Sequence, residues 1–295
     1  MICSSCASDW ELSGINKIDA GSPISGEPGI GVVGFNDDRT GIAVCSYGLI
    51  VITDNGGKTW NKSGCSGGYY DLDSLDIMGS HAWTAGELDF RVSSDAGRTW
   101  TVIPHYGGED IQGHYISFCD INTGWFATGE HLIGRESLWS TSDNGINWKS
   151  ISVPEGCENR IMAIQCLDEN SGFICTREGL VFKTENRGIQ WTKIRLPLGN
   201  RIPIDYNPGF PVHAIRFISD ERGIVVFYFS KPRGFIIFET IDGGKSWRES
   251  VLPGRNAPSL GSVYLSRDGN TLVIYDVNSE SIFRYRRKSE LKRRP

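Results

Sequence analysis

An eight-residue motif occurs five times in this chain of 295 residues. It reads Ser/Thr-x-Asp/Asn-x-Gly-x-x-Trp, and its copies cover residues 53–60, 93–100, 141–148, 184–191 and 240–247. The tryptophans that end the copies are 40, 48, 43 and 56 residues apart. A repeat of this length indicates a chain built from one supersecondary unit used several times, as in propellers and solenoids.

The residue types of the motif predict a tight turn between two strands. The Asp or Asn can accept hydrogen bonds from backbone N–H groups just ahead, and the glycine can take a positive φ. The Ser or Thr can bond across the turn, and the Trp is expected to begin the next strand and pack over the hairpin. We therefore assign these residues a structural role: Asn55, Gly57, Trp60, Asp95, Gly97, Trp100, Asp143, Gly145, Trp148, Asn186, Gly188, Trp191, Asp242, Gly244 and Trp247.

Three short apolar runs precede each copy, so each repeat predicts four strands, the fourth beginning one or two residues before its Trp. The predicted fold is all-β: a six-bladed propeller of four-stranded antiparallel blades in one domain of 295 residues, with seven blades as the alternative. The blades are expected near residues 30–64, 70–104, 114–154, 160–197, 211–253 and 260–287. The last blade lacks its fourth strand, and the Trp10 segment at residues 9–15 is expected to supply it and close the ring.

Composition restricts the class of protein further. The chain has 36 glycines, 39% hydrophobic residues and no apolar run long enough for a transmembrane helix. Residues 284–295 hold seven basic residues and one acid in a chain of net charge −5. We expect a basic tail at residues 288–295, either a solvated terminus or a handle for an anionic partner, while the acidic remainder disfavours a nucleic-acid binder.

The eight cysteines leave the compartment open. Cys45, Cys119, Cys166 and Cys175 lie in apolar runs and are expected in the core. Disulfides at Cys3–Cys6 or Cys65–Cys157 remain alternatives, and no second ligand pair accompanies the Cys3–Cys6 spacing, so no metal site is predicted. With no signal peptide in the first residues, we expect a cytoplasmic protein if Met1 is the true start, and an extracytoplasmic one if a leader was removed.

The five motifs resemble the Asp-box, or BNR repeat, over roughly residues 9–285. Phrases such as residues 123–130, 81–87, 171–176 and 40–45 are similar to the second-strand motif of the photosystem II assembly-factor propellers. The more distant resemblance is to the sialidase superfamily. The first family implies a non-enzymatic scaffold that helps to assemble other proteins, and the second implies glycoside hydrolysis.

The resemblance implies a binding face on the side of the ring away from the motifs. That face is built from the loops that enter each blade and from those joining its second and third strands. Candidate residues on these loops are Tyr69, Tyr70, His105, Tyr106, His114, Arg160, Arg201, Asp205, Tyr206, Arg233 and Arg255. Arg201 opens an Arg-Ile-Pro sequence like that of sialidases, but here it follows the fourth motif, whereas in that family it precedes the first.

We therefore expect a non-catalytic scaffold that presents loops to a protein partner, as an assembly or accessory factor. The alternatives are a sialidase-like glycoside hydrolase and a lectin-like propeller, so a glycan ligand stays open. We expect no catalytic residues, cofactor, metal, nucleic-acid partner or membrane span, and a monomer.

Overall fold

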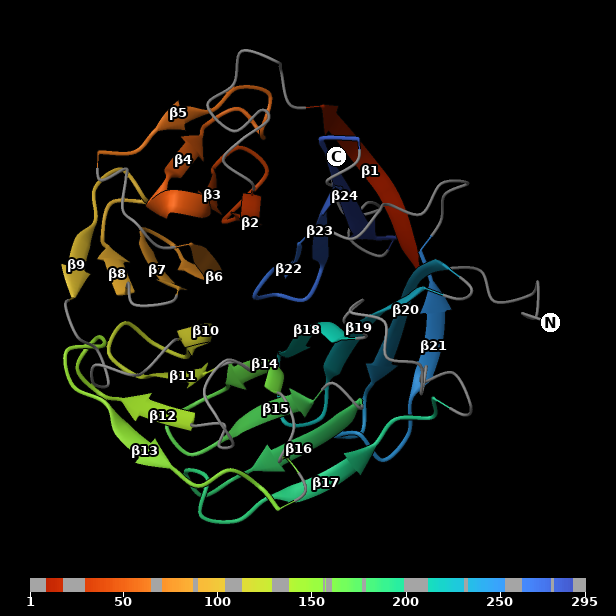
Figure 1. The fold of residues 1–295 in the computed structure, drawn as a ribbon. Helices are drawn as coiled ribbons and strands as arrows, with labels where there is room; N and C mark the ends of the chain where they lie inside the picture. Colours follow the sequence, from red (N-terminus) through yellow and green to blue (C-terminus); the bar gives the residue numbers. More distant parts are fainter. Residues whose placement is uncertain are drawn as a thin grey trace.

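Six four-stranded sheets form a ring around a central axis in the computed structural model (Figure 1). The structure describes residues 9–17, 30–64, 71–86, 90–103, 113–128, 138–155, 157, 161–176, 179–198, 212–230, 233–252, 262–276 and 279–288. Neighbouring strands in every sheet are antiparallel. The predicted all-β, six-bladed propeller is confirmed.

Five blades use consecutive strands, ordered here from the axis to the rim. Blade 1 contains β2 (Ile30–Phe35), β3 (Gly41–Cys45), β4 (Ile50–Thr53) and β5 (Asn61–Lys62), with the 3-10 turn η1 (Ser46–Gly48) after β3. Blade 2 contains β6 (Leu72–Met78), β7 (His81–Gly86), β8 (Phe90–Ser93) and β9 (Thr101–Ile103). Blade 3 contains β10 (Gly113–Phe118), β11 (Gly124–Thr128), β12 (Leu138–Thr141) and β13 (Lys149–Ile151). Blade 4 contains β14 (Ile161–Cys166), β15 (Gly172–Thr176), β16 (Leu180–Thr184) and β17 (Thr192–Arg195). Blade 5 contains β18 (Val212–Phe217), β19 (Gly223–Ser230), β20 (Arg233–Thr240) and β21 (Arg248–Val251).

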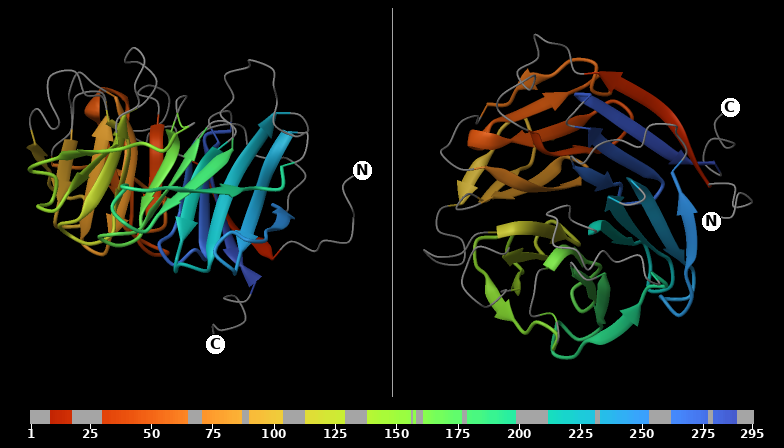
Figure 2. Two further views of the ribbon diagram at one scale, coloured as in Figure 1. Left: turned by 90° about the horizontal axis from the view of Figure 1, so that it is seen from below. Right: turned by 45° about the vertical axis from the view of Figure 1, so that its right-hand side comes forward.

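Blade 6 joins the two ends of the described chain. It contains β22 (Val263–Leu265), β23 (Thr271–Asp276) and β24 (Ser281–Arg287), and its outermost strand is β1 (Trp10–Lys17). β1 pairs with β24 from Trp10 opposite Arg287 to Lys17 opposite Ser281. Both views in Figure 2 show β1 beside the last strand. The predicted closure by an N-terminal strand is therefore confirmed, and β1 extends beyond the expected residues 9–15.

The hydrophobic core lies between the blades. One cluster joins blades 2 and 3, where the rings of Trp83 and Phe118 stack with centroids 4.1 Å apart. Another joins blades 4 and 5, where Phe173 and Phe217 stack at 3.7 Å. Because each sheet buries both faces against its neighbours, its three inner strands are mostly apolar, whereas outermost strands such as β5 and β13 are polar and exposed.

The five repeated motifs form five equivalent turns between the third and fourth strands. In each, the leading hydroxyl accepts the N–H of the glycine at 2.8–3.0 Å. The Asp or Asn accepts the N–H four residues ahead at 2.8–3.0 Å. The five glycines have φ between 79° and 88°. The residue before each glycine donates its N–H to the turn joining the first two strands of the same blade.

The outermost strands begin later than the sequence predicted. β5 begins at Asn61 and β9 at Thr101, each one residue after the Trp that was expected to lie inside the strand. The reason is that the turn's side-chain hydrogen bonds hold the backbone up to the residue before the Trp, as when Asn55 accepts the N–H of Thr59. The backbone therefore joins the sheet only after the Trp.

Candidate functional site

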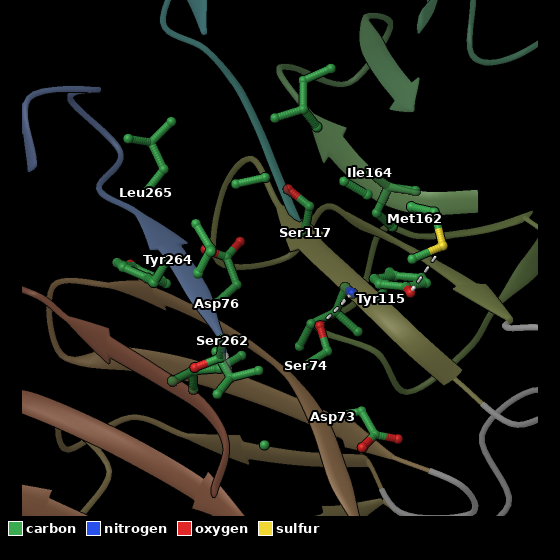
Figure 3. Close-up of a pocket in the computed structure, with 18 of the residues that line it drawn as sticks. Asp73, Ser74, Asp76, Tyr115, Ser117, Met162, Ile164, Ser262, Tyr264 and Leu265 are labelled. Atoms are coloured by element: carbon green, nitrogen blue, oxygen red, sulfur yellow. Dashed lines mark hydrogen bonds between the residues drawn. The ribbon is translucent and has the colours of Figure 1, made fainter. Parts of the chain in front are cut away.

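A pocket of about 500 Å³ lies on the axis of the ring. Its wall is formed mainly by the innermost strand of each blade, namely β2, β6, β10, β14, β18 and β22. Figure 3 shows labelled side chains from four of these strands facing this space. A central depression that gathers side chains from every blade is the position from which a propeller can contact one ligand with all its repeats.

The lining combines aromatic, apolar and hydroxyl groups. Tyr115 and Met162 lie side by side on one wall, with the Tyr115 hydroxyl 3.8 Å from the Met162 sulfur (Figure 3). Tyr264 lies on another wall, and burial raises the pKa of its phenol to about 12. The phenol therefore stays neutral at ordinary pH and offers a hydrogen-bonding group rather than a charge.

A network of ion pairs crosses one side of the pocket. Asp76 is 1% exposed; it forms an ion pair with Arg267 at 2.8 Å and lies 4.0 Å from the Arg216 guanidinium. The same carboxylate accepts the backbone N–H of Phe118 at 2.7 Å and that of Ile77 at 3.0 Å. Arg216 also lines the pocket, and its buried Nε has no hydrogen-bond partner among the described residues.

Polar side chains in or beside the innermost strands of blades 2, 3, 4 and 6 bond each of these blades to the next one around the ring. Ser74 Oγ accepts the N–H of Ile116, Ser117 Oγ accepts that of Cys166, and Ser262 Oγ accepts that of Val33. Gln165 makes two bonds to Phe217, accepting its N–H at 2.5 Å and donating to its carbonyl at 2.6 Å. The free edge of an innermost strand would otherwise present unpaired backbone groups to the pocket. The hydrogen bonds of these hydroxyls, the Asp76 carboxylate and the Gln165 amide are therefore made to backbone groups of the ring itself.

Sequence reasoning did not identify these residues. The available signal was a polar residue inside an otherwise apolar innermost strand, repeated from blade to blade, as with Asp76, Ser117 and Gln165. Burial of a polar side chain without a hydrogen-bond partner costs free energy, so a polar residue that recurs at this position predicts a specific hydrogen bond.

The predicted binding-face residues fall largely outside the described part of the chain. Tyr69, Tyr70, His105, Tyr106, Arg160, Arg201, Asp205, Tyr206 and Arg255 are outside it. His114 lies in β10 and Arg233 in β20, and only their backbones are described. Their role in binding stays a prediction. The two alternative disulfides also involve residues outside the described chain.

The described residues contain no group of three or more His, Cys, Asp or Glu side chains arranged to hold a metal ion. Within the same residues, no helix has the length and apolar character needed to cross a membrane.

No protein-family model matches the chain. Over 144 residues the sequence is 28% identical to the photosystem II assembly lipoprotein Ycf48 of Synechococcus sp. (strain CC9902). That match covers 48% of this chain and only 38% of the cyanobacterial protein. It confirms the resemblance to the photosystem II assembly-factor propellers.

Solved structures show the same fold. A structure described as YCF48 bound to D1 peptide has a TM-score of 0.58 and 15% identity, covering 95% of this chain and 96% of that one. YCF48 from Cyanidioschyzon merolae has a TM-score of 0.50 and 16% identity, covering 96% and 99%. An ancestral GH74 enzyme has a TM-score of 0.57 and 14% identity, covering 90% of this chain and 37% of that chain. At these identities the structural similarity establishes the fold, whereas the activity has to be argued from the residues of the site.

Proposed function

We propose that this propeller is a non-catalytic binding module that holds an extended segment of a partner protein at the central pocket, in an assembly or accessory role. The observation that carries the proposal is the pocket itself, about 500 Å³ in volume and lined from all six blades. Its mixture of aromatic, thioether and hydroxyl groups suits a peptide, which presents apolar side chains and backbone polar groups together.

One side chain in the pocket wall, that of Arg216, carries a hydrogen-bond donor that no described residue accepts. The Nε of Arg216 is buried and makes no hydrogen bond to a described residue, while its charge is balanced by Asp76 at 4.0 Å. A buried donor without an acceptor is costly, and because Nε is closed off from solvent here, an incoming carbonyl gains this bond only when the Arg216 side chain turns toward the pocket. A peptide backbone supplies carbonyls of this kind.

The same wall argues against glycoside hydrolysis at this pocket. Most glycoside hydrolases use two carboxyl groups on opposite sides of the scissile bond, one of which exchanges a proton; sialidases, with a Tyr nucleophile, are an exception. Among the described residues, the carboxylates that line this pocket are Asp73 and Asp76, and both belong to β6. Asp76 is already bonded to Arg267 and to the backbone N–H of Phe118, so its oxygens are committed to the fold.

The relatives support the protein-binding proposal over the alternatives. The homologous sequence is named as an assembly lipoprotein, and one structure of the same fold is described with a peptide bound. The GH74 enzymes share the fold over only part of their own length.

The experiment measures peptide binding by the full-length chain. A peptide from D1 and a phage-displayed peptide library are the probes, and each selected peptide is titrated by calorimetry. Ala214→Trp, which fills the pocket wall, should weaken binding at least tenfold. Ile189→Ser, at a 78% exposed position on a rim turn, is the matched control and should bind as the wild type does.

If Ala214→Trp leaves the affinity of the selected peptides unchanged, they bind elsewhere, and the pocket is refuted as the binding site. One GH74 structure of this fold is described as a xyloglucanase. Cleavage of xyloglucan by the wild type, abolished by Ala214→Trp, would therefore overturn the non-catalytic assignment. The thermal midpoint of each variant is measured first, so that a loss of folding is not taken for a loss of binding.

A further inference from the structure

Two cysteine sulfurs face each other across the interface between blades 3 and 4. Cys119 follows β10, and Cys166 is the last residue of β14. The Cys166 thiol points at the Cys119 sulfur, and their Sγ atoms are 2.7 Å apart. This pair lies outside the pocket lining and plays no part in the proposed function.

The separation of the sulfurs is unusually short for two thiols. It falls between an ordinary non-bonded contact of roughly 3.5–4 Å and a disulfide bond of about 2.05 Å. The two strands are already fixed beside each other, because Ser117 Oγ accepts the N–H of Cys166 at 3.1 Å. Bond formation would therefore need a small side-chain movement and little change in the backbone.

The two thiols differ in access to solvent. Cys166 is 2% exposed, whereas Cys119 is only partly buried. The hydrogen bond to Cys119, together with burial, holds the pKa of the Cys166 thiol well above its usual range. An oxidant in solution therefore meets Cys119 first, and Cys166 is the resolving partner.

We propose that Cys119 and Cys166 are an oxidisable pair that forms a disulfide between blades 3 and 4 when the protein meets hydrogen peroxide. The Cys119 thiolate attacks one peroxide oxygen, the O–O bond breaks, and a sulfenic acid and hydroxide form. The Cys166 sulfur then attacks the Cys119 sulfur, the S–O bond breaks, and the Cys166 proton leaves with that oxygen as water. Two electrons pass from the two thiols to peroxide, which ends as two molecules of water.

The cross-link would join residues 47 positions apart and restrict the unfolded chain. The thermal midpoint of the oxidised protein should therefore rise by several degrees and return to the reduced value after treatment with dithiothreitol.

The experiment uses the full-length chain, reduced, desalted and then exposed to peroxide or to buffer. Remaining thiols are alkylated, and the protein is digested with trypsin and a protease that cleaves after glutamate. Cleavage after Glu169 separates Cys166 from Cys175, so mass spectrometry can identify the linked peptides. The expected product is the Cys119 peptide joined to the Cys166 peptide and lighter than their sum by two hydrogens.

The variants test the assignment one sulfur at a time. Cys119→Ser and Cys166→Ser should each abolish the linked peptide and the rise in thermal midpoint. Cys45→Ser, at a fully buried cysteine in blade 1, is the matched control and should keep both. If the change at the buried Cys166 prevents folding, the partly buried Cys119 carries the test.

Folded protein in which both thiols are still alkylated after peroxide treatment would overturn the proposal. So would a disulfide from Cys119 to another cysteine, or overoxidation of Cys119 without a linked peptide.

Discussion

Replacement of Trp10 tests how the ring is closed. Trp10 begins β1, the strand that completes blade 6, and its side chain is fully buried. Its indole packs in the cluster between blades 5 and 6, and its Nε1 donates to Glu239 at 2.9 Å. The guanidinium of Arg287 lies over the ring at 5.4 Å. Trp10→Ala thus removes apolar contact, a charge-assisted hydrogen bond and a cation–π contact together.

The expected loss in free energy of unfolding is about 3–5 kcal/mol, the usual range for a buried Trp changed to Ala. The estimate stays in that range because Glu239 keeps two other partners, Arg248 at 3.0 Å and Arg287 at 3.1 Å, so its charge is not left unpaired. For a chain of this size the loss corresponds to a fall in thermal midpoint of roughly 6–15 °C.

Trp10→Phe separates packing from hydrogen bonding. It keeps most of the ring contact and loses the bond to Glu239, so we expect a loss of about 1–3 kcal/mol. Trp60→Phe is the matched control, because Trp60 is also buried but its Nε1 has no hydrogen-bond partner among the described residues. Trp60→Phe should therefore destabilise the protein less than Trp10→Phe does, by about 1 kcal/mol or more.

Thermal and denaturant unfolding followed by circular dichroism measure all three variants. A thermal midpoint for Trp10→Ala within about 1 °C of the wild type would refute closure of the ring by β1. Equal losses for the two Phe variants would refute the contribution of the bond to Glu239.

Three further changes test the turns and the blade interfaces. Hydrogen bonds from Thr99 lower the pKa of Asp95 from 3.8 to about 2. The Asp95 carboxylate therefore stabilises the fold above pH ~4, and this effect is lost as the pH falls toward 2. The difference in thermal midpoint between the wild type and Asp95→Asn should shrink over the same interval. Gly97→Ala should lower the free energy of unfolding in urea by about 1–3 kcal/mol, because φ is +80° and a Cβ would lie 2.7 Å from a neighbouring side chain. Gly14→Ala is the control and should be nearly neutral, since the space around Gly14 is open. Equal effects of the two changes would contradict the reasoning. Gln165→Leu should cost about 2–4 kcal/mol by the same measurement because it leaves two buried backbone groups without partners, and an unchanged stability would show that those bonds are dispensable.

The sequence predicted the ring because its turns depend on specific chemistry. Asp95 and Gly97 occupy positions that few other residues can fill, since one accepts the N–H of Thr99 and the other has a positive φ. Five such turns in phase fix the number of complete blades, and Trp10 without a turn before it indicates the strand that completes the sixth.

The hydrogen bonds that join neighbouring blades around the central pocket could not be predicted in the same way. Gln165 reads as one polar residue in an apolar run, and its bonds to Phe217 depend on the distance between two blades, which no local pattern records. The start of the outer strands was predicted too early for a related reason. Trp60 has high strand propensity, but the side-chain bonds of the turn determine where the sheet begins.

The basic run at the C-terminus also has a structural explanation. Arg286 forms an ion pair with Asp38 of blade 1, and Arg287 forms one with the buried Glu239 of blade 5 at 3.1 Å. Arg284 donates to the carbonyl of Asp38 at 3.1 Å. Blade 6 is therefore held on both sides by arginines of its own strand β24, at the point where the ring is joined by hydrogen bonds rather than by a continuous chain. These three arginines lie in the predicted last strand, before the tail expected at residues 288–295, and their contacts take part in closing the ring.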